Sequence, residues 1–197
     1  MGIENKQNLK LPFEEFLHSY DIVKSAIELI RKNAKSLDFY NNHFIPCTRV
    51  CYDLANNTEE DLLDAVLLGL FHDYGKFFID DQDNHEIIGA EKAKEFLVSN
   101  GYSSKKILEI TTAIRNHKGN ANDDCLSHLS KMIINADSIS YIQEIDYFFN
   151  YLLENNCSYE QARNIVEEKI AHNKARMDNQ GHLYLTALAL EESELIN

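Results

Sequence analysis

Two carboxylates in this chain each stand at the end of an apolar run, where an unpaired charge is costly to bury. The largely apolar run 62–71 is followed by His72 and Asp73, and a second run, 132–136, is followed by Asp137. A buried carboxylate or imidazole needs a partner that offsets its lost solvation. A divalent cation would be such a partner at both places. The pattern therefore predicts that these residues bind a metal ion.

Three further histidines have contexts that suit a metal site. His43 is followed at four and eight positions by Cys47 and Cys51, which would place it at the inward-facing start of a small-residue helix face. His85 is followed by small residues four, five and eight positions later, so a neighbouring helix could approach closely. His117 ends a predicted helix beside basic residues. These histidines are therefore candidate ligands.

Pro46 lies three residues after His43 and affects how that histidine is positioned. A proline disfavours helical geometry at the residue before it. We therefore expect the helix predicted over about 44–55 to start after His43. Of the candidate ligands, His43 is the one whose local geometry Pro46 most affects.

Other reactive side chains fit ordinary structural roles better. Cys47 and Cys51 share a helix face and could bind a metal, but free cysteine usually behaves as a small core residue, and packing is the favoured interpretation. The remaining histidines are interpreted as surface or core-edge residues: His18, His128, His172 and His182. One aromatic cluster is interpreted as core rather than as a base-stacking platform, although one of its tyrosines could face a nucleotide: Tyr141, Tyr147, Phe148, Phe149 and Tyr151.

The composition indicates one helical domain over residues 1–197. Hydrophobic residues make up 44% of the chain, and 7 Gly and 2 Pro are too few for a turn-rich β fold. A formal net charge of −13 disfavours binding to nucleic-acid polymers. The first six residues do not resemble a signal peptide, and no apolar run is long enough to span a membrane. We therefore expect an all-α cytoplasmic protein without a nucleic-acid or membrane partner.

Helical periodicity runs through almost the whole chain, and the candidate ligands fall at the ends of predicted helices. Pro12 suits a helix start, and Thr58, Ser103 and Ser158 suit helix N-caps. A polar loop is expected over 79–84. The expected helices cover about 12–33, 44–55, 58–73, 85–99, 103–117, a segment that holds Asp137, 141–153, 158–177 and 182–194.

The order of these residues resembles the HD-domain superfamily of metal-dependent phosphohydrolases over about 42–140. The segment His72-Asp73-Tyr74-Gly75-Lys76 is similar to the family's His-Asp-x-Gly-Lys form, and Ala136-Asp137 to its final Ala-Asp. The resemblance implies a helical bundle of the HD type, with N-terminal and C-terminal helices packed on that core. It also implies two groups of ligands: His43, His72, Asp73 and Asp137 for one metal, and His85 and His117 for a second metal or the substrate.

The resemblance further implies that Asp73 is catalytic, because it would bridge two metal ions. Imidazole and carboxylate ligands suit manganese, iron, cobalt or nickel, with one or two ions bound. Two-metal relatives often have paired histidines where this chain has His117 and Lys118. This difference from the family pattern concerns the ligands of the second metal ion and not those of the first.

A substrate phosphate would need local positive charge in so acidic a chain. The resemblance gives this role to Lys76, and Gly75 is expected to leave room for a close approach of the substrate. Arg115 and Lys118 are further candidates for phosphate binding.

The expected function is hydrolysis of a phosphoester or phosphoanhydride in a small nucleotide-like substrate by water that the metal activates. Local similarities to enzymes that split dinucleoside tetraphosphates, and to cyclic-dinucleotide phosphodiesterases, leave the substrate open. Two other functions also remain open: a non-catalytic metal-containing module that senses a nucleotide, and a di-iron HD-type oxygenase. The helices from Tyr141 onward have three interpretations, as a lid, as the surface of a homodimer or as plain core.

Overall fold

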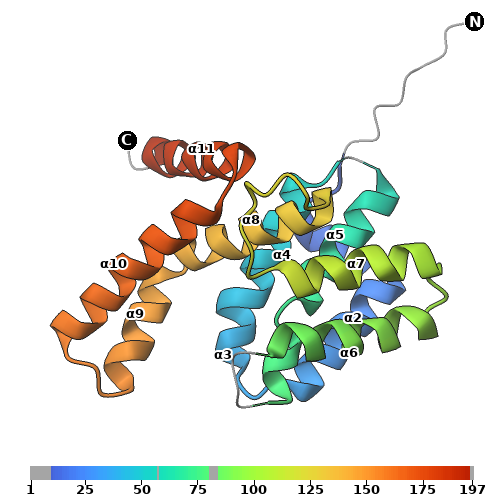
Figure 1. Ribbon diagram of the computed structural model, residues 1–197, viewed down its shortest axis with the longest axis horizontal. Coiled ribbons are helices and arrows are strands. Elements are labelled where there is room, and N and C mark those ends of the chain that lie inside the picture. Colours follow the sequence, from blue (N-terminus) through green and yellow to red (C-terminus); the bar gives the residue numbers. More distant parts are fainter. Residues whose placement is uncertain (1–9, 57, 80–83, 196–197) are drawn as a thin grey trace, which may run out of the picture.

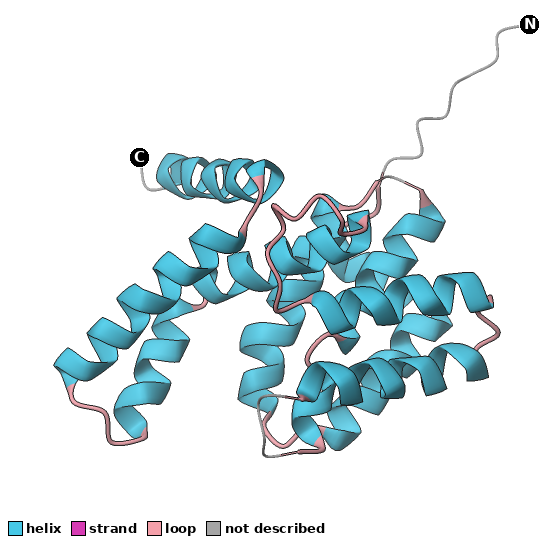
Figure 2. Ribbon diagram, in the orientation of Figure 1, coloured by secondary structure: helices cyan, strands magenta, loops and turns pink. Residues whose placement is uncertain are grey.

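The computed structural model describes residues 10–56, 58–79 and 84–195, and every regular element in those ranges is a helix (Figure 2). This confirms the all-α prediction. The first six residues and most of the predicted loop 79–84 lie outside the described residues. The elements are α1 (Phe13–Ser19), α2 (Asp21–Asn33), α3 (Leu37–Phe39), the π-helix η1 (Tyr40–Phe44), α4 (Ile45–Leu54), α5 (Glu59–Phe71), the 3-10 helix η2 (Tyr74–Phe77), α6 (His85–Ser99), α7 (Ser104–Asn116), α8 (His128–Gln143), α9 (Ile145–Glu154), α10 (Tyr159–Arg176) and α11 (Asn179–Leu195).

The predicted helix caps are confirmed at α5, α7 and α10. Thr58 Oγ1 accepts a hydrogen bond from the backbone N–H of Asp61 at 3.2 Å, and Ser103 caps α7 in the same way. Ser158 forms a reciprocal capping box with Gln161. Each hydroxyl satisfies a backbone N–H that has no partner inside its helix. Local sequence signals therefore determine where these helices start.

Helix α5 lies at the buried centre of the bundle. It is apolar on most of its faces, and Val66, Leu67 and Leu68 are fully buried. Because such a helix has no side that water can solvate well, α2, α4, α6, α7 and α8 all pack against it. Gly69 lets α4 come close, since a Cβ at this position would lie 2.6 Å from the Cα of Thr48. This packing holds the C-terminal end of α5, where His72 and Asp73 follow.

The first predicted helix, over 12–33, is wrong as a single element. It is divided into α1 and α2 at Tyr20, whose backbone is extended (φ −118°, ψ 125°). The break allows the ring of Phe16 to pack on Tyr52, with ring centroids 4.9 Å apart, while α2 packs on α5. Both halves have helical periodicity, and periodicity alone does not report a change of axis direction.

The predicted helix over 141–153 is wrong at its start. Tyr141 belongs to the last turn of α8, and α9 begins only after Glu144, whose backbone leaves the helical region (φ −96°, ψ 26°). The change of direction places α9 outside the bundle. None of the residues of α9 is buried, although the helix is strongly apolar on one side.

Helices α9 and α10 form a hairpin that extends away from the rest of the bundle (Figure 1). The chain returns to the bundle after α9, because α10 and α11 both contact α8.

Within the described ranges, no helix is both long and apolar enough to cross a membrane. The homodimer stays a prediction.

Candidate metal centre

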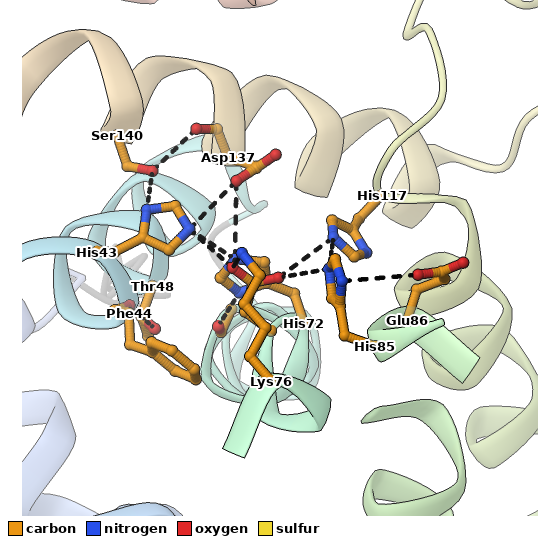
Figure 3. A network of polar contacts seen from close by, with 12 residues as sticks. His43, Phe44, Thr48, His72, Lys76, His85, Glu86, His117, Asp137 and Ser140 are labelled. Atoms are coloured by element: carbon orange, nitrogen blue, oxygen red, sulfur yellow. Dashed lines mark hydrogen bonds and ion pairs between the residues drawn. The ribbon is translucent and has the colours of Figure 1, made fainter. Parts of the chain in front are cut away.

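The structure brings all six predicted ligands together in one buried site. Figure 3 labels all of them except Asp73. The ligands come from five elements that are far apart in the chain: η1, α5, α6, α7 and α8. Each element has one end or one face at the site. Each residue is at most 4% exposed: His43 in η1, His72 and Asp73 after α5, His85 at the start of α6, His117 after α7 and Asp137 in α8.

The first cluster centres on His43. Its Nε2 lies 3.3 Å from His72 Nε2, 3.1 Å from Asp73 Oδ2 and 3.3 Å from Asp137 Oδ1. The Oδ1 of Asp137 also lies 3.8 Å from His72 Nε2. Two imidazole nitrogens and two carboxylate oxygens therefore converge on one small volume, which is the donor set of a transition-metal site.

The second cluster uses the other oxygen of Asp73. Asp73 Oδ1 lies 2.9 Å from His85 Nε2 and 3.4 Å from His117 Nε2, and the two imidazole nitrogens lie 3.1 Å apart. Within the described residues, Asp73 Oδ1 is buried and makes no hydrogen bond in spite of this short approach. A buried carboxylate oxygen without a donor needs another source of positive charge. A cation between these three atoms would supply it.

Backbone carbonyls determine which ring nitrogen is protonated in two of the histidines. The Nδ1 atoms of His72 and His117 each lie 2.7 Å from a carbonyl oxygen, of Gly69 and Ile114 respectively. A carbonyl oxygen only accepts, so Nδ1 is the donor in both rings. In the neutral rings Nε2 therefore keeps its lone pair and faces the site. This is the form in which histidine binds a metal ion.

A short π-helix positions His43. The helix predicted over about 44–55 is α4, which begins after His43 as expected, and η1 adds a π-helical turn before it that contains His43. The N–H of Ile45 bonds to the carbonyl of Tyr40, five residues earlier, and η1 runs directly into α4. Pro46 has no N–H and crowds the carbonyl four residues before it. The wider π turn just before Pro46 accommodates this misfit, so the chain stays helical through His43.

The charges of the site hold one another in their ionised forms. Burial alone would raise the pKa of Asp73, but Lys76 and the neighbouring histidines hold it well below its usual value. Burial would also raise the pKa of Asp137, yet His43 and Arg176 lower it. Burial alone would lower the pKa of His43, but Asp137 and Asp73 raise it. Both carboxylates are therefore anionic at neutral pH.

Lys76 is the predicted phosphate-binding residue that lies in the site. Its Nζ bonds to Asp73 Oδ2 and faces a cavity next to the first cluster. Burial lowers the pKa of Lys76, but Asp73 outweighs it and holds the pKa above its usual value. The expectation for Gly75 is wrong, because a Cβ there would clash with the carbonyl oxygen of His85. The space at Gly75 is filled by the start of α6, not left for a substrate.

The other two phosphate-binding candidates lie away from this cavity. Arg115 pairs with Glu91 on the surface, and its side chain is 42% exposed. Lys118 Nζ lies 2.7 Å from Glu86 Oε2, and that oxygen is 3.8 Å from His85 Nδ1. Lys118 therefore borders the second cluster from outside. A phosphate-binding role for either residue stays a prediction.

Sequence reasoning missed Arg176, the last residue of α10. Its Nη1 donates to Asp137 Oδ2 at 3.2 Å, its Nε donates to Gly119 O at 3.2 Å, and its Nη2 donates to His117 O. One guanidinium thus orients a carboxylate of the first cluster and the backbone beside a ligand of the second. Arg176 lies 59 residues after His117, and nothing in its local sequence marks it.

A cavity of about 500 Å³ adjoins the first cluster at His43 and Lys76. Half of its lining residues are phenylalanines or tyrosines: Phe39, Phe77, Tyr141, Tyr147, Phe148 and Tyr151. The interpretation of the aromatic cluster as core is therefore wrong, because none of its five members is buried and four of them line the cavity. The fifth, Phe149, contacts Tyr159 at a centroid distance of 5.4 Å. Four of the five belong to α9, which lies outside the bundle.

The remaining reactive side chains have the structural roles predicted for them. Cys47 and Cys51 are fully buried in α4, and burial raises the pKa of Cys47 well above its usual value. The four histidines that were not assigned to the site are exposed: His18, His128, His172 and His182.

A family model for the HD domain matches residues 40–142, slightly more than half of the chain. The structure is also similar to the crystal structure of a predicted HD superfamily hydrolase from an uncultured Thermotogales bacterium, with a TM-score of 0.59 and 22% sequence identity. That similarity covers 82% of this chain and 92% of the other, and at this identity it shows a shared fold. No curated protein matches the sequence.

Proposed function

Because the chain belongs to the HD domain family, we propose that it is a metal-dependent phosphohydrolase that cleaves a phosphoester or phosphoanhydride bond in a small nucleotide-like substrate. The position of Asp73 carries this proposal. Its Oδ2 lies 3.1 Å from His43 Nε2, and its Oδ1 lies 2.9 Å from His85 Nε2. A single carboxylate can thus serve both clusters, as a two-metal hydrolytic site requires.

Each cluster would hold one divalent ion of the manganese, iron, cobalt or nickel type. The residues for the first ion are His43, His72, Asp73 and Asp137, and those for the second are Asp73, His85 and His117. A divalent ion at these positions supplies Lewis acidity toward a phosphoryl oxygen and toward an attacking water.

The side chains around the clusters have two further tasks. Lys76 presents its ammonium group between Asp73 and the cavity, where it can donate a charge-assisted hydrogen bond to a phosphoryl oxygen. The ring of Tyr141 covers His43, with ring centroids 4.4 Å apart, and so limits access of water from that side. The substrate would therefore enter through the cavity, with its phosphoryl group toward Lys76.

Hydrolysis by the full chain, supplied with Mn²⁺, tests this function. The substrates are nucleoside monophosphates, dinucleoside polyphosphates and cyclic dinucleotides, and the products are measured directly. We expect turnover of at least one class and its loss in Asp73→Asn. Nucleotide binding without turnover, unchanged in Asp73→Ala, would instead support a sensing module. Oxygen consumption by the iron-loaded protein would support an oxygenase.

The metal content of the purified protein tests the two clusters separately. We expect about two ions per chain, one for each set of ligands. His85→Asn should remove the second ion and leave the first. A content of about one ion that His85→Asn does not change would return His85 and His117 to substrate binding.

A further inference from the structure

The cavity beside the metal centre has two aromatic walls from different parts of the chain. Phe39 in α3 and Phe77 in η2 form one wall, at a centroid distance of 6.5 Å from each other. Tyr147, Phe148 and Tyr151 of α9 form the second wall. The cavity is therefore lined by aromatic rings from two separate parts of the chain, and the metal ligand His43 also belongs to its lining.

The two walls are not packed against each other. Among the described residues, no ring contact joins Phe39 or Phe77 to an aromatic residue of α9. Apart from the buried Phe77, the rings that line the cavity keep part of their surface accessible, and Tyr151 is 49% exposed. Aromatic surface in a cavity of this size can be covered by a flat organic group, which stacks with either wall.

The charges of the lining limit how many phosphoryl groups the occupant carries. Among the described residues, its cations are Lys35 and Lys76, and Lys76 is paired with Asp73. Glu144 adds a negative charge to the lining, and burial raises the pKa of this carboxyl group. One phosphoryl group would lie at Lys76 and the adjoining metal centre. Further phosphates would have to lie against the aromatic rings and Glu144 of the lining, where Lys35 is the other cation among the described residues.

Two polar side chains of the lining, Asn42 and Glu144, offer hydrogen-bond acceptors to the occupant. Asn42 donates its Nδ2 to Asp38 O at 2.9 Å, which leaves its Oδ1 as an acceptor at the cavity. Glu144, when ionised, is an acceptor as well. A planar ring with N–H donors on its edge would satisfy both. Nucleobases have such edges, whereas a simple aryl group does not.

We propose that this aromatic cavity is the subsite for the base of a nucleoside monophosphate, whose single phosphoryl group lies at Lys76 and the metal centre. This proposal rests on the proposed phosphohydrolase function and narrows its substrate class. It disfavours dinucleoside polyphosphates, because their additional phosphates would lie against the aromatic rings and Glu144, and cyclic dinucleotides, because they carry two bases and two phosphates.

The test compares two phosphoesters that differ in the base alone, adenosine 5′-monophosphate and ribose 5-phosphate, in the Mn²⁺-loaded full chain. We expect a lower KM for the nucleotide. Phe148→Ala should raise that KM by about tenfold, as for the loss of one stacking ring. The same substitution should leave ribose 5-phosphate hydrolysis unchanged. Leu153→Ala is the matched control, because Leu153 is on the same helix but does not line the cavity.

A binding measurement separates failure of this subsite from failure of the proposed function. Calorimetry with adenosine and the metal-free protein should show binding that Phe148→Ala weakens and Leu153→Ala does not. If adenosine binds in this way but no phosphoester is hydrolysed, the subsite stands and the function fails. Equal hydrolysis of both phosphoesters with no adenosine binding would overturn the subsite alone. Preference for a dinucleoside tetraphosphate or a cyclic dinucleotide would overturn the single-phosphate assignment.

Discussion

Helices α8 and α9 follow each other in the chain but are buried to opposite degrees. Ten of the 16 residues of α8 are buried, including the ligand Asp137, whereas none of the residues of α9 is buried. The metal ligands therefore come from parts of the molecule that packing holds in place. The outer wall of the cavity comes from a helix with much less support. Fixed geometry is required at the metal, and more adjustment is tolerated where an organic group is covered.

Substitution of the most buried charge should have the largest effect. Asp73→Asn removes the carboxylate shared by both clusters, so we expect hydrolysis to fall by more than about 100-fold and metal content to drop. The metal-free variant should also lose about 3–5 kcal/mol of unfolding free energy, because Lys76 keeps its charge without its partner. Metal analysis and denaturant unfolding measure the two effects.

The control for Asp73→Asn is Asp64→Asn in α5. Asp64 is 2% exposed and pairs with Lys106, away from the ligands. This variant should be destabilised in a similar way but should keep its metal. If both variants lost metal equally, general destabilisation rather than ligand loss would explain the result for Asp73.

Arg176 connects the less supported C-terminal hairpin to the metal centre. Arg176→Met removes the donor to Asp137 Oδ2, so we expect metal affinity to fall by about 10–100-fold. Arg176→Lys should recover part of that loss, since it keeps the charge but not the forked donors. Lys174→Met, an exposed position on the same helix, should leave affinity unchanged. Calorimetric titration with Mn²⁺ would reveal whether Arg176 orients the ligands or only stabilises the fold.

Truncation of one side chain in each helix tests the comparison of α8 with α9 directly. Ile133→Ala in α8 should cost about 2–5 kcal/mol of unfolding free energy, because Ile133 is fully buried. Tyr151→Ala in α9 should change it by about 0.5 kcal/mol at most, as is usual for an exposed site. Equal losses in urea unfolding would show that α9 is as firmly packed as α8.

The pH dependence of the metal-free protein should be the smallest effect. The pKa of His43 is raised in the folded state, so its contribution is complete below the unfolded value of about 6.5 and is lost as pH rises. The pKa values of Asp73 and Asp137 are lowered in the folded state, so the stability that these carboxylates contribute is lost as pH falls below about 3.9. The melting temperature of the chelator-treated protein should therefore fall between pH 6.5 and 8.5, and a rise over this range would contradict the assignment.

Much of the fold follows from short-range signals in the sequence. Apolar periodicity indicates an all-helical chain, and the hydroxyls of Thr58, Ser103 and Ser158 mark where three helices start. These features depend on neighbours within about one helical turn, so they are visible without a structure. The division at Tyr20 is not visible in this way, because it is imposed by packing between distant helices.

The residue types of the metal centre can likewise be predicted from the sequence, since histidines and aspartates at apolar helix ends require a polar partner when buried. The distances between these side chains cannot be predicted in this way, because five elements meet at the site only after the bundle has packed. Only the tertiary structure places Arg176 on Asp137, fills the space at Gly75 with α6 and turns α9 outward so that its rings line a cavity. Each of these depends on contacts between residues far apart in the chain, which local periodicity does not encode.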